Sequence, residues 1–292
     1  MQKIILLFII FLSIAFAPTV SGQHLNIIDG DNISNIIGDE IDAQWSADGK
    51  KLLFLSRENK NSIICIYFTD TDTLLYISDL DYNFNNPVWH PDGNKIVFNS
   101  HKNGIEYLYV IDLKTNKVTP LFNRKIRCRN ASFSASSRQV YFTGYNELDR
   151  RWEIYSYDFI YDNINRLTNY EFGCSNPEIS KDGKLIAYCK QKPFKGTTSI
   201  DIINWYGESI ISFKDIVGTF PIWSPSAFKL FFISHMDNKT GELYSIWKDG
   251  SHLERLTDDD LQIGYPSISP DESKIAISVL TESGWDIYII SL

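Results

Sequence analysis

One sequence pattern recurs six times at almost constant spacing and constrains this chain more than any other feature. Its clearest copy runs from Trp89 to Phe98 as an aromatic anchor, a short polar turn and an apolar run. The six anchors stand 44, 44, 46, 44 and 45 residues apart. They are Trp45, Trp89, Phe133, Ile179, Trp223 and Ile268. A fixed period of this length is typical of propeller blades and of other stacked repeats.

Each copy predicts a hairpin whose second strand is buried on both faces. Asp-Gly follows the anchor at 48–49, 92–93 and 182–183, and this pair favours a tight turn because Gly reaches positive φ at little cost. The turns at 136–137, 226–227 and 271–272 lack Gly, so they either need no positive φ or carry a little strain. Runs such as 52–54, 96–98 and 230–232 are apolar at successive positions, which suits a sheet between two neighbouring sheets.

A second pair of short strands follows each hairpin. Tyr109–Asp112 and Lys117–Thr119 form such a pair around a polar turn, and no long helical periodicity interrupts the series. Four strands in each of six units predict an all-β, six-bladed β-propeller. The last unit ends with Ile287–Ile290, one strand short. We therefore expect Leu25–Ile28 to supply the missing strand and close the ring, which removes two exposed sheet edges.

The first 22 residues have the features of a secretory signal peptide. Lys3 precedes an apolar run from Ile4 to Phe16, and small residues at 20–22 predict cleavage before Gln23. This apolar run is shorter than the roughly 20 residues that span a bilayer. We expect an exported protein, periplasmic or secreted, with no transmembrane segment after cleavage and a single propeller domain over residues 23–292.

The repeat also carries a family resemblance. The pattern Trp-Ser/His-Pro-Asp-Gly-x-Lys-Ile-x-Phe, with Tyr-x-x-Asp and Arg-Leu-Thr downstream, resembles the WD40-like (PD40) repeat of TolB-type propellers, most closely at residues 247–257. The resemblance covers nearly all of the mature chain and implies the fold. It does not imply one function, since this repeat serves translocation proteins, peptidase propellers and sugar-degrading proteins alike. The family's namesake belongs to the periplasmic Tol-Pal system and has a separate domain before its propeller, which is not expected here.

The sequence contains none of the motifs that we sought for catalysis. Gly-x-Ser-x-Gly, His-Glu-x-x-His, Cys-x-x-Cys and phosphate-binding loops are absent, so we expect no enzyme and no cofactor. His101 and His235 each follow an anchor by twelve residues, in blades that face each other across the ring. This separation is too wide for one metal ion. The alternative function is a sugar lyase or hydrolase on the same fold, which a measurement of metal content would test.

Two of the four cysteines are candidates for a disulfide. Cys128 and Cys174 each lie five residues before an anchor, in adjacent blades, and an exported protein favours such bonds. Cys65 and Cys189 lie inside apolar strands and are expected to be buried thiols.

Charge provides the one indication of a binding surface. The net charge of −8 disfavours nucleic acid as a partner. Basic residues nevertheless gather in loops that should emerge on one face of the propeller, either as a binding site or as solvated surface. The predicted binding residues are Arg127, Arg129, Arg150, Arg151, Lys192, His101 and His235. Trp205 and Tyr206 should be exposed on the opposite face. We expect a monomeric, non-catalytic binding propeller of a bacterial envelope, with a protein or anionic glycan as partner.

Overall fold

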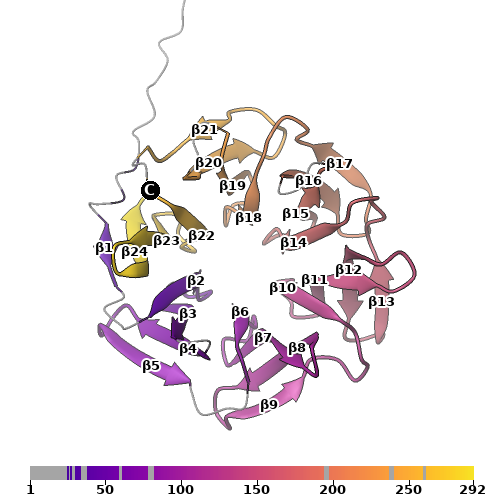
Figure 1. Cartoon of the computed structure of the whole chain (residues 1–292), viewed down its shortest axis with the longest axis horizontal. Helices are drawn as coiled ribbons and strands as arrows, with labels where there is room; N and C mark the ends of the chain where they lie inside the picture. The colour runs from indigo at the N-terminus through magenta and orange to yellow at the C-terminus, as the bar shows by residue number, and fades with distance from the viewer. Residues whose placement is uncertain are drawn as a thin grey trace, which may run out of the picture.

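A computed structural model shows six four-stranded antiparallel sheets arranged as a ring around a central axis (Figure 1). It describes residues 25, 27, 30–33, 38–58, 61–77, 82–193, 197–236, 240–258 and 261–292. These residues form strands and no α-helix, which confirms the predicted all-β, six-bladed propeller. Within these ranges no helix is long and apolar enough to cross a membrane. The predicted signal peptide and the start at Gln23 lie outside the described residues.

The blades follow one another along the chain, and in each the first strand lies nearest the axis and the fourth lies at the rim (Figure 1). Blade one holds β2 (Asp39–Trp45), β3 (Lys51–Glu58), β4 (Asn61–Phe68) and β5 (Thr73–Ile77). Blade two holds β6 (Asn85–Trp89), β7 (Lys95–Lys102), β8 (Ile105–Asp112) and β9 (Lys117–Pro120). Blade three holds β10 (Cys128–Phe133), β11 (Gln139–Asn146), β12 (Arg151–Asp158) and β13 (Asn163–Arg166).

The second half of the ring repeats this order. Blade four holds β14 (Cys174–Ile179), β15 (Leu185–Gln191), β16 (Thr198–Asn204) and β17 (Ser209–Ser212). Blade five holds β18 (Thr219–Trp223), β19 (Lys229–Ser234), β20 (Glu242–Trp247) and β21 (Glu254–Arg255). Blade six holds β22 (Ile263–Ile268), β23 (Lys274–Thr281), β24 (Gly284–Ser291) and the N-terminal β1 (Asp31–Asn32).

The N-terminal strand closes the last blade as predicted, but a different segment does so. Asp31 and Asn32 pair with Ile289 and Tyr288 of β24. The prediction that Leu25–Ile28 forms this strand was wrong, because Leu25 instead bridges to Thr257 of blade five. Ile27, only 1% exposed, packs in a cluster shared by blades five and six. Leu25 and Ile27 therefore pack into the core, while Asp31 and Asn32 pair with β24.

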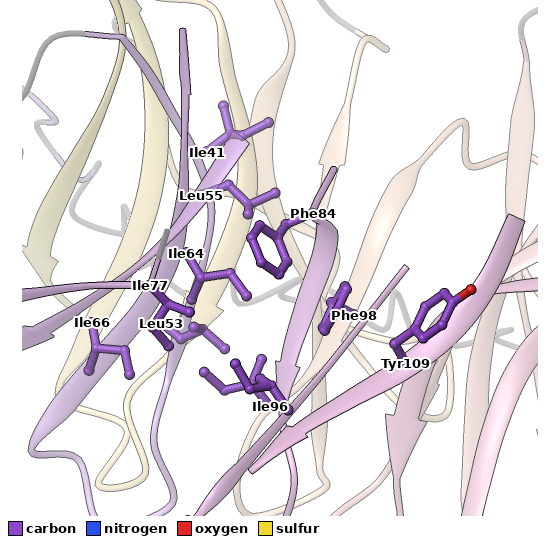
Figure 2. Close-up of a cluster of buried hydrophobic side chains, with 11 residues drawn as sticks. Ile41, Leu53, Leu55, Ile64, Ile66, Ile77, Phe84, Ile96, Phe98 and Tyr109 are labelled. Carbon is purple, nitrogen blue, oxygen red and sulfur yellow. The ribbon is translucent and has the colours of Figure 1, made fainter. Parts of the chain in front are cut away.

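Neighbouring blades pack face to face, and this packing explains the apolar runs. Leu53 and Leu55 of β3 face blade two, in a cluster that includes Ile96 and Phe98 (Figure 2). Leu52, on the other side of β3, packs against blade six. Both faces of the strand are thus buried, and each such side chain contributes roughly 1.5–3 kcal/mol to folding.

The six hairpins that follow the anchors share one conformation. In each, the residue after the anchor accepts a hydrogen bond from a backbone N–H three residues on, as Ser46 does from Gly49 at 2.9 Å. The three turns without Gly have the same left-handed residue, with φ of 58° at Ser137 and 59° at Ala227 and Glu272. The alternative of a turn without positive φ was wrong, and these residues carry the strain instead.

Candidate functional site: the basic cluster of the upper face

The predicted basic residues emerge on one face of the ring, here called the upper face, which carries the blade-to-blade connections and the turns between second and third strands. Arg127 and Arg129 lie at the start of β10 and, being two residues apart, project from the same side of the strand. The guanidinium carbon of Arg129 is 4.3 Å from the ring centroid of Trp152 on β12. That of Arg127 is 4.3 Å from the ring of Tyr145 and 5.2 Å from that of Trp152.

The two rings form one platform because Tyr145 and Trp152 are direct partners across the β11–β12 pair, with centroids 5.2 Å apart. The platform places two positive charges within 5.2 Å of a single indole. We call Arg127, Arg129, Tyr145 and Trp152 the basic cluster. The sequence analysis did not single out Trp152, so its contact with both arginines was missed.

Neither arginine forms an ion pair within the described part of the chain, although Glu106 lies near Arg129. The Nε of Arg129 is buried and has no hydrogen-bond partner among the described residues. Burial lowers the pKa of Arg129, the nearby Glu106 raises it, and Arg127 lowers it further. A guanidinium stacked on an aromatic ring keeps its N–H edges free for a carboxylate or phosphate. The basic cluster is therefore chemically suited to bind an anion.

The other predicted arginines and Lys192 differ from this cluster in their contacts. Arg150 is exposed in the β11–β12 turn with φ of 55° and has no ion pair among the described residues. Arg151 is held internally, because its Nε donates to Glu153 at 3.0 Å and its terminal nitrogen to Asn169 at 2.6 Å. Lys192 donates from Nζ to the Lys214 carbonyl at 3.0 Å. Arg151 and Lys192 are thus engaged in holding loops together.

The two predicted histidines are not brought together. His101 is the second-to-last residue of β7 in blade two and His235 follows β19 in blade five, and these blades lie across the ring from each other (Figure 1). Both side chains are exposed. Among the described residues, no three His, Cys, Asp or Glu side chains gather closely enough to hold a metal ion.

The central channel has a ring of residues that the sequence interpretation did not single out. Each innermost strand has a bulge, and the bulged residue, three positions before the anchor, has positive φ. These residues are Asp42, Asn86, Asn130, Asn176, Phe220 and Tyr265. They line a cavity of about 90 Å³. Asp and Asn tolerate this conformation, whereas the two aromatic residues are strained in it.

Two acidic side chains of the channel have unusual titration behaviour. Burial raises the pKa of Asp42 to about 7, although Arg57 and a hydrogen bond from Asn86 act in the opposite direction. Burial also raises the pKa of Glu178 to about 7, partly offset by a hydrogen bond with Ser132. Both side chains contact the channel cavity and are otherwise enclosed by protein, which explains the dominance of desolvation.

The opposite, lower face carries the exposed aromatic pair that the sequence predicted. Trp205 and Tyr206 are 47% and 55% exposed and lie edge to face, with centroids 4.7 Å apart. They occupy the β16–β17 turn, at the other end of the strands from the basic cluster. They therefore provide a control surface for any test of the upper face.

All four cysteines are free, buried thiols. The considered Cys128–Cys174 disulfide is not formed in this structure, although the two residues begin the equivalent strands β10 and β14. Cys128 packs against Val97 and Leu108 of blade two, whereas Cys174 packs against Ile154 of blade three. Equivalent side chains point in the same direction around the ring, so sheet three lies between the two thiols.

Comparisons with known proteins agree with the fold. The family model of the TolB β-propeller domain matches residues 24–267. The structure is similar to TolB from Acinetobacter baumannii at 23% identity and a TM-score of 0.67, covering 80% of this chain and 58% of that one. It is also similar to a TolB-like protein from Agrobacterium tumefaciens at 19% identity and a TM-score of 0.68, covering 89% of this chain and 92% of that one.

A third similar structure is an enzyme. The oligogalacturonate lyase from Vibrio parahaemolyticus is 12% identical with a TM-score of 0.61, and the match covers 89% of this chain and 92% of that one. At these identities the solved structures share the fold alone. The chain spans 58% of the length of TolB from A. baumannii. No curated protein sequence matches the chain.

Proposed function

Because the chain belongs to the TolB β-propeller domain family, we propose that it is a non-catalytic binding module of the bacterial envelope. Its partner is a carboxylate-bearing surface, either an acidic protein or an anionic glycan, bound on the upper face. The signal-like residues 1–22 support export to the periplasm or beyond. The rigid ring supports a binding role, since loops held by a rigid scaffold commonly carry function.

The observation that supports this proposal is that neither arginine of the basic cluster forms an ion pair among the described residues. The chain has more acidic than basic residues, 36 against 28, so neutralising partners are abundant. Five of its nine arginines form ion pairs within the described residues. Arg127 and Arg129 do not, although they lie close to each other on Trp152. Two neighbouring cations without an ion pair favour a partner that supplies negative charge.

Reversal of both charges tests the proposal. The Arg127→Glu/Arg129→Glu variant, immobilised, should bind poly-L-glutamate or polygalacturonate much more weakly than the parent, and should lose the partner captured from envelope extract. The two polymers distinguish a peptide-like from a glycan-like partner. The loss should be larger at low salt, where exposed charges act over longer distances.

A matched control reverses two cations of the lower face. Lys181→Glu/Lys248→Glu makes the same change in net charge at exposed turns on the other side of the ring. It should retain binding and the parental melting temperature. Equal losses in both variants would show that net charge alone governs binding, and no loss in the arginine variant would refute the proposed site.

A further inference from the structure

A second concave site lies at the outer side of blade two, next to the connection that leads into blade three. Its volume is about 670 Å³, within the range of small-molecule sites. Tyr82, Tyr107, Tyr109 and Phe122 form its aromatic wall. The side chains of Lys102, Arg124 and Lys125 line its rim.

The pocket exists because blade two departs from a motif that blades three and five share. In blade three, Glu153 on the third strand is buried beneath Arg166 and Thr168 of the fourth-strand segment. In blade five, Glu242 takes the same place with Arg255 and Thr257. These polar groups fill the corner above the short fourth strand.

Backbone pairing identifies the corresponding residues of blade two. The backbone N–H of Leu121 donates a hydrogen bond to the Leu108 carbonyl at 3.0 Å. The equivalent bonds run from Leu167 to Ile154 in blade three and from Leu256 to Leu243 in blade five, both at 2.8 Å. Tyr107, Pro120 and Phe122 therefore occupy the positions of the glutamate, arginine and threonine. This exchange replaces a filled ionic corner by an open, aromatic one. A place where one blade lacks a motif that other blades share is a candidate functional site.

Three of the residues that line the pocket are tyrosines. None of Tyr82, Tyr107 and Tyr109 donates or accepts a side-chain hydrogen bond within the described residues. Tyr109 is only 6% exposed, and its hydroxyl points away from the apolar cluster of blades one and two (Figure 2). Burial raises the pKa of Tyr109, and the proximity of Tyr82 and Tyr107 raises it further.

The charged residues that line the pocket in the described part of the chain are all basic. Lys102 and Lys125 form no ion pair among the described residues, whereas Arg124 is paired with Asp162 at 2.6 Å. None of the lining residues that the structure describes carries a carboxylate. An aromatic wall, three tyrosine hydroxyl groups and two ammonium groups without ion pairs among the described residues together define the chemistry of a ligand.

We propose that this pocket binds a small organic acid whose ring packs against Tyr107, Tyr109 and Phe122. Its carboxylate meets the ammonium groups of Lys102 and Lys125, and the tyrosine hydroxyls hydrogen-bond the remaining polar groups. Aromatic acids and acidic sugars share this chemistry. The inference goes beyond the proposed function and does not depend on the partner of the basic cluster.

Calorimetry with matched acid and neutral probes tests the inference on the full chain. One arm compares 2-naphthoate with 2-naphthalenemethanol, and the other compares glucuronate with glucose. We expect one acid to bind with a stoichiometry of one, at least about tenfold more tightly than its neutral counterpart. The arm that gives binding identifies the ligand as aromatic or sugar-like. Absence of binding by both acids, or equal binding of acid and neutral probe, would overturn the inference.

Variants then locate the bound acid. Lys102→Glu/Lys125→Glu should abolish binding, whereas Arg127→Glu/Arg129→Glu and Lys181→Glu/Lys248→Glu should leave it within about twofold of the parent. Tyr107→Glu/Pro120→Arg/Phe122→Thr, which introduces the filled corner of blades three and five, should also abolish it. If Tyr107→Glu/Pro120→Arg/Phe122→Thr does not fold, Lys102→Glu/Lys125→Glu alone tests whether the acid binds in this pocket. Unchanged affinity in Lys102→Glu/Lys125→Glu would place the acid elsewhere and refute this site.

Discussion

The hydroxyl of Thr168 donates a hydrogen bond to the buried carboxylate of Glu153 at 2.5 Å, from one strand segment of blade three to the next. The same hydroxyl accepts the backbone N–H of Ile154 at 2.9 Å. Thr257 makes both contacts in blade five, to Glu242 and to the N–H of Leu243. The Arg-Leu-Thr segments of the sequence thus fasten the fourth strand to the third by satisfying a buried charge and a buried amide together.

We expect Thr168→Val to destabilise the fold. Valine keeps the shape but leaves Glu153 and the N–H of Ile154 short of one partner each, at a cost of about 1–3 kcal/mol. Urea denaturation measures the change. Thr71→Val, which removes a hydroxyl that contacts only the exposed Thr73, is the control and should change stability little. Equal effects of the two substitutions would show that the buried contacts add nothing.

Ile27 should be necessary for stable closure of the ring. Its side chain packs in the cluster that joins blades five and six, next to Ile233 and Ile263. Ile27→Ala should lower the free energy of unfolding by about 2–5 kcal/mol. The same change at Ile160, which is 67% exposed, should cost less than about 0.5 kcal/mol. Thermal melting of both variants compares them, and a parental melting temperature for Ile27→Ala would contradict the role of this segment.

Asp42 should make the stability of the propeller depend on pH. Its pKa rises from the ordinary 3.8 to about 7 on folding, so the native state retains a proton that the unfolded chain releases. The resulting stabilisation is complete below about pH 4 and is lost as the pH rises to about 7, at about 1.4 kcal/mol for each unit of difference in pKa. Glu178 acts in the same sense.

Asp42→Asn isolates this contribution, because blades two, three and four already have asparagine at the equivalent left-handed position. Above pH 7 the variant should be more stable than the parent, and near pH 4 the difference should disappear. Urea midpoints at the two pH values measure it. A constant difference at both values would mean that Asp42 does not titrate with the fold.

The ring itself could be predicted because its signal is repeated: six anchors at nearly equal spacing, each followed by an apolar run. Strand β1 could not, since Asp31 and Asn32 are polar, number only two and have no periodicity. Asp31 and Asn32 form a strand because they pair with the backbone of β24, a contact between distant parts of the chain. The Leu25–Ile28 segment was predicted to form this strand because it is apolar, but Leu25 and Ile27 pack into the core.

The basic cluster was predictable in part. Arg127 and Arg129 could be placed on the upper face from the blade register, and the structure places them there. Their stacking on Trp152 depends on contacts between β10 and the β11–β12 hairpin, which no sequence spacing reveals. Arg151 carries the same charge but is held by Glu153, so residue type alone did not separate free from engaged arginines.

Replacing both arginines by lysine is the sharpest test of how the basic cluster recognises an anion. Arg127→Lys/Arg129→Lys keeps the charge but loses the planar guanidinium, its stacking on Trp152 and its bidentate contact with a carboxylate. Affinity for the preferred polymer should fall to a value between those of the parent and of the glutamate variant, by about tenfold. The slope of affinity against salt concentration should stay as in the parent, because the number of charges is unchanged. Parental affinity in the lysine variant would show that the cluster acts through charge alone, and that Trp152 has no part in recognition.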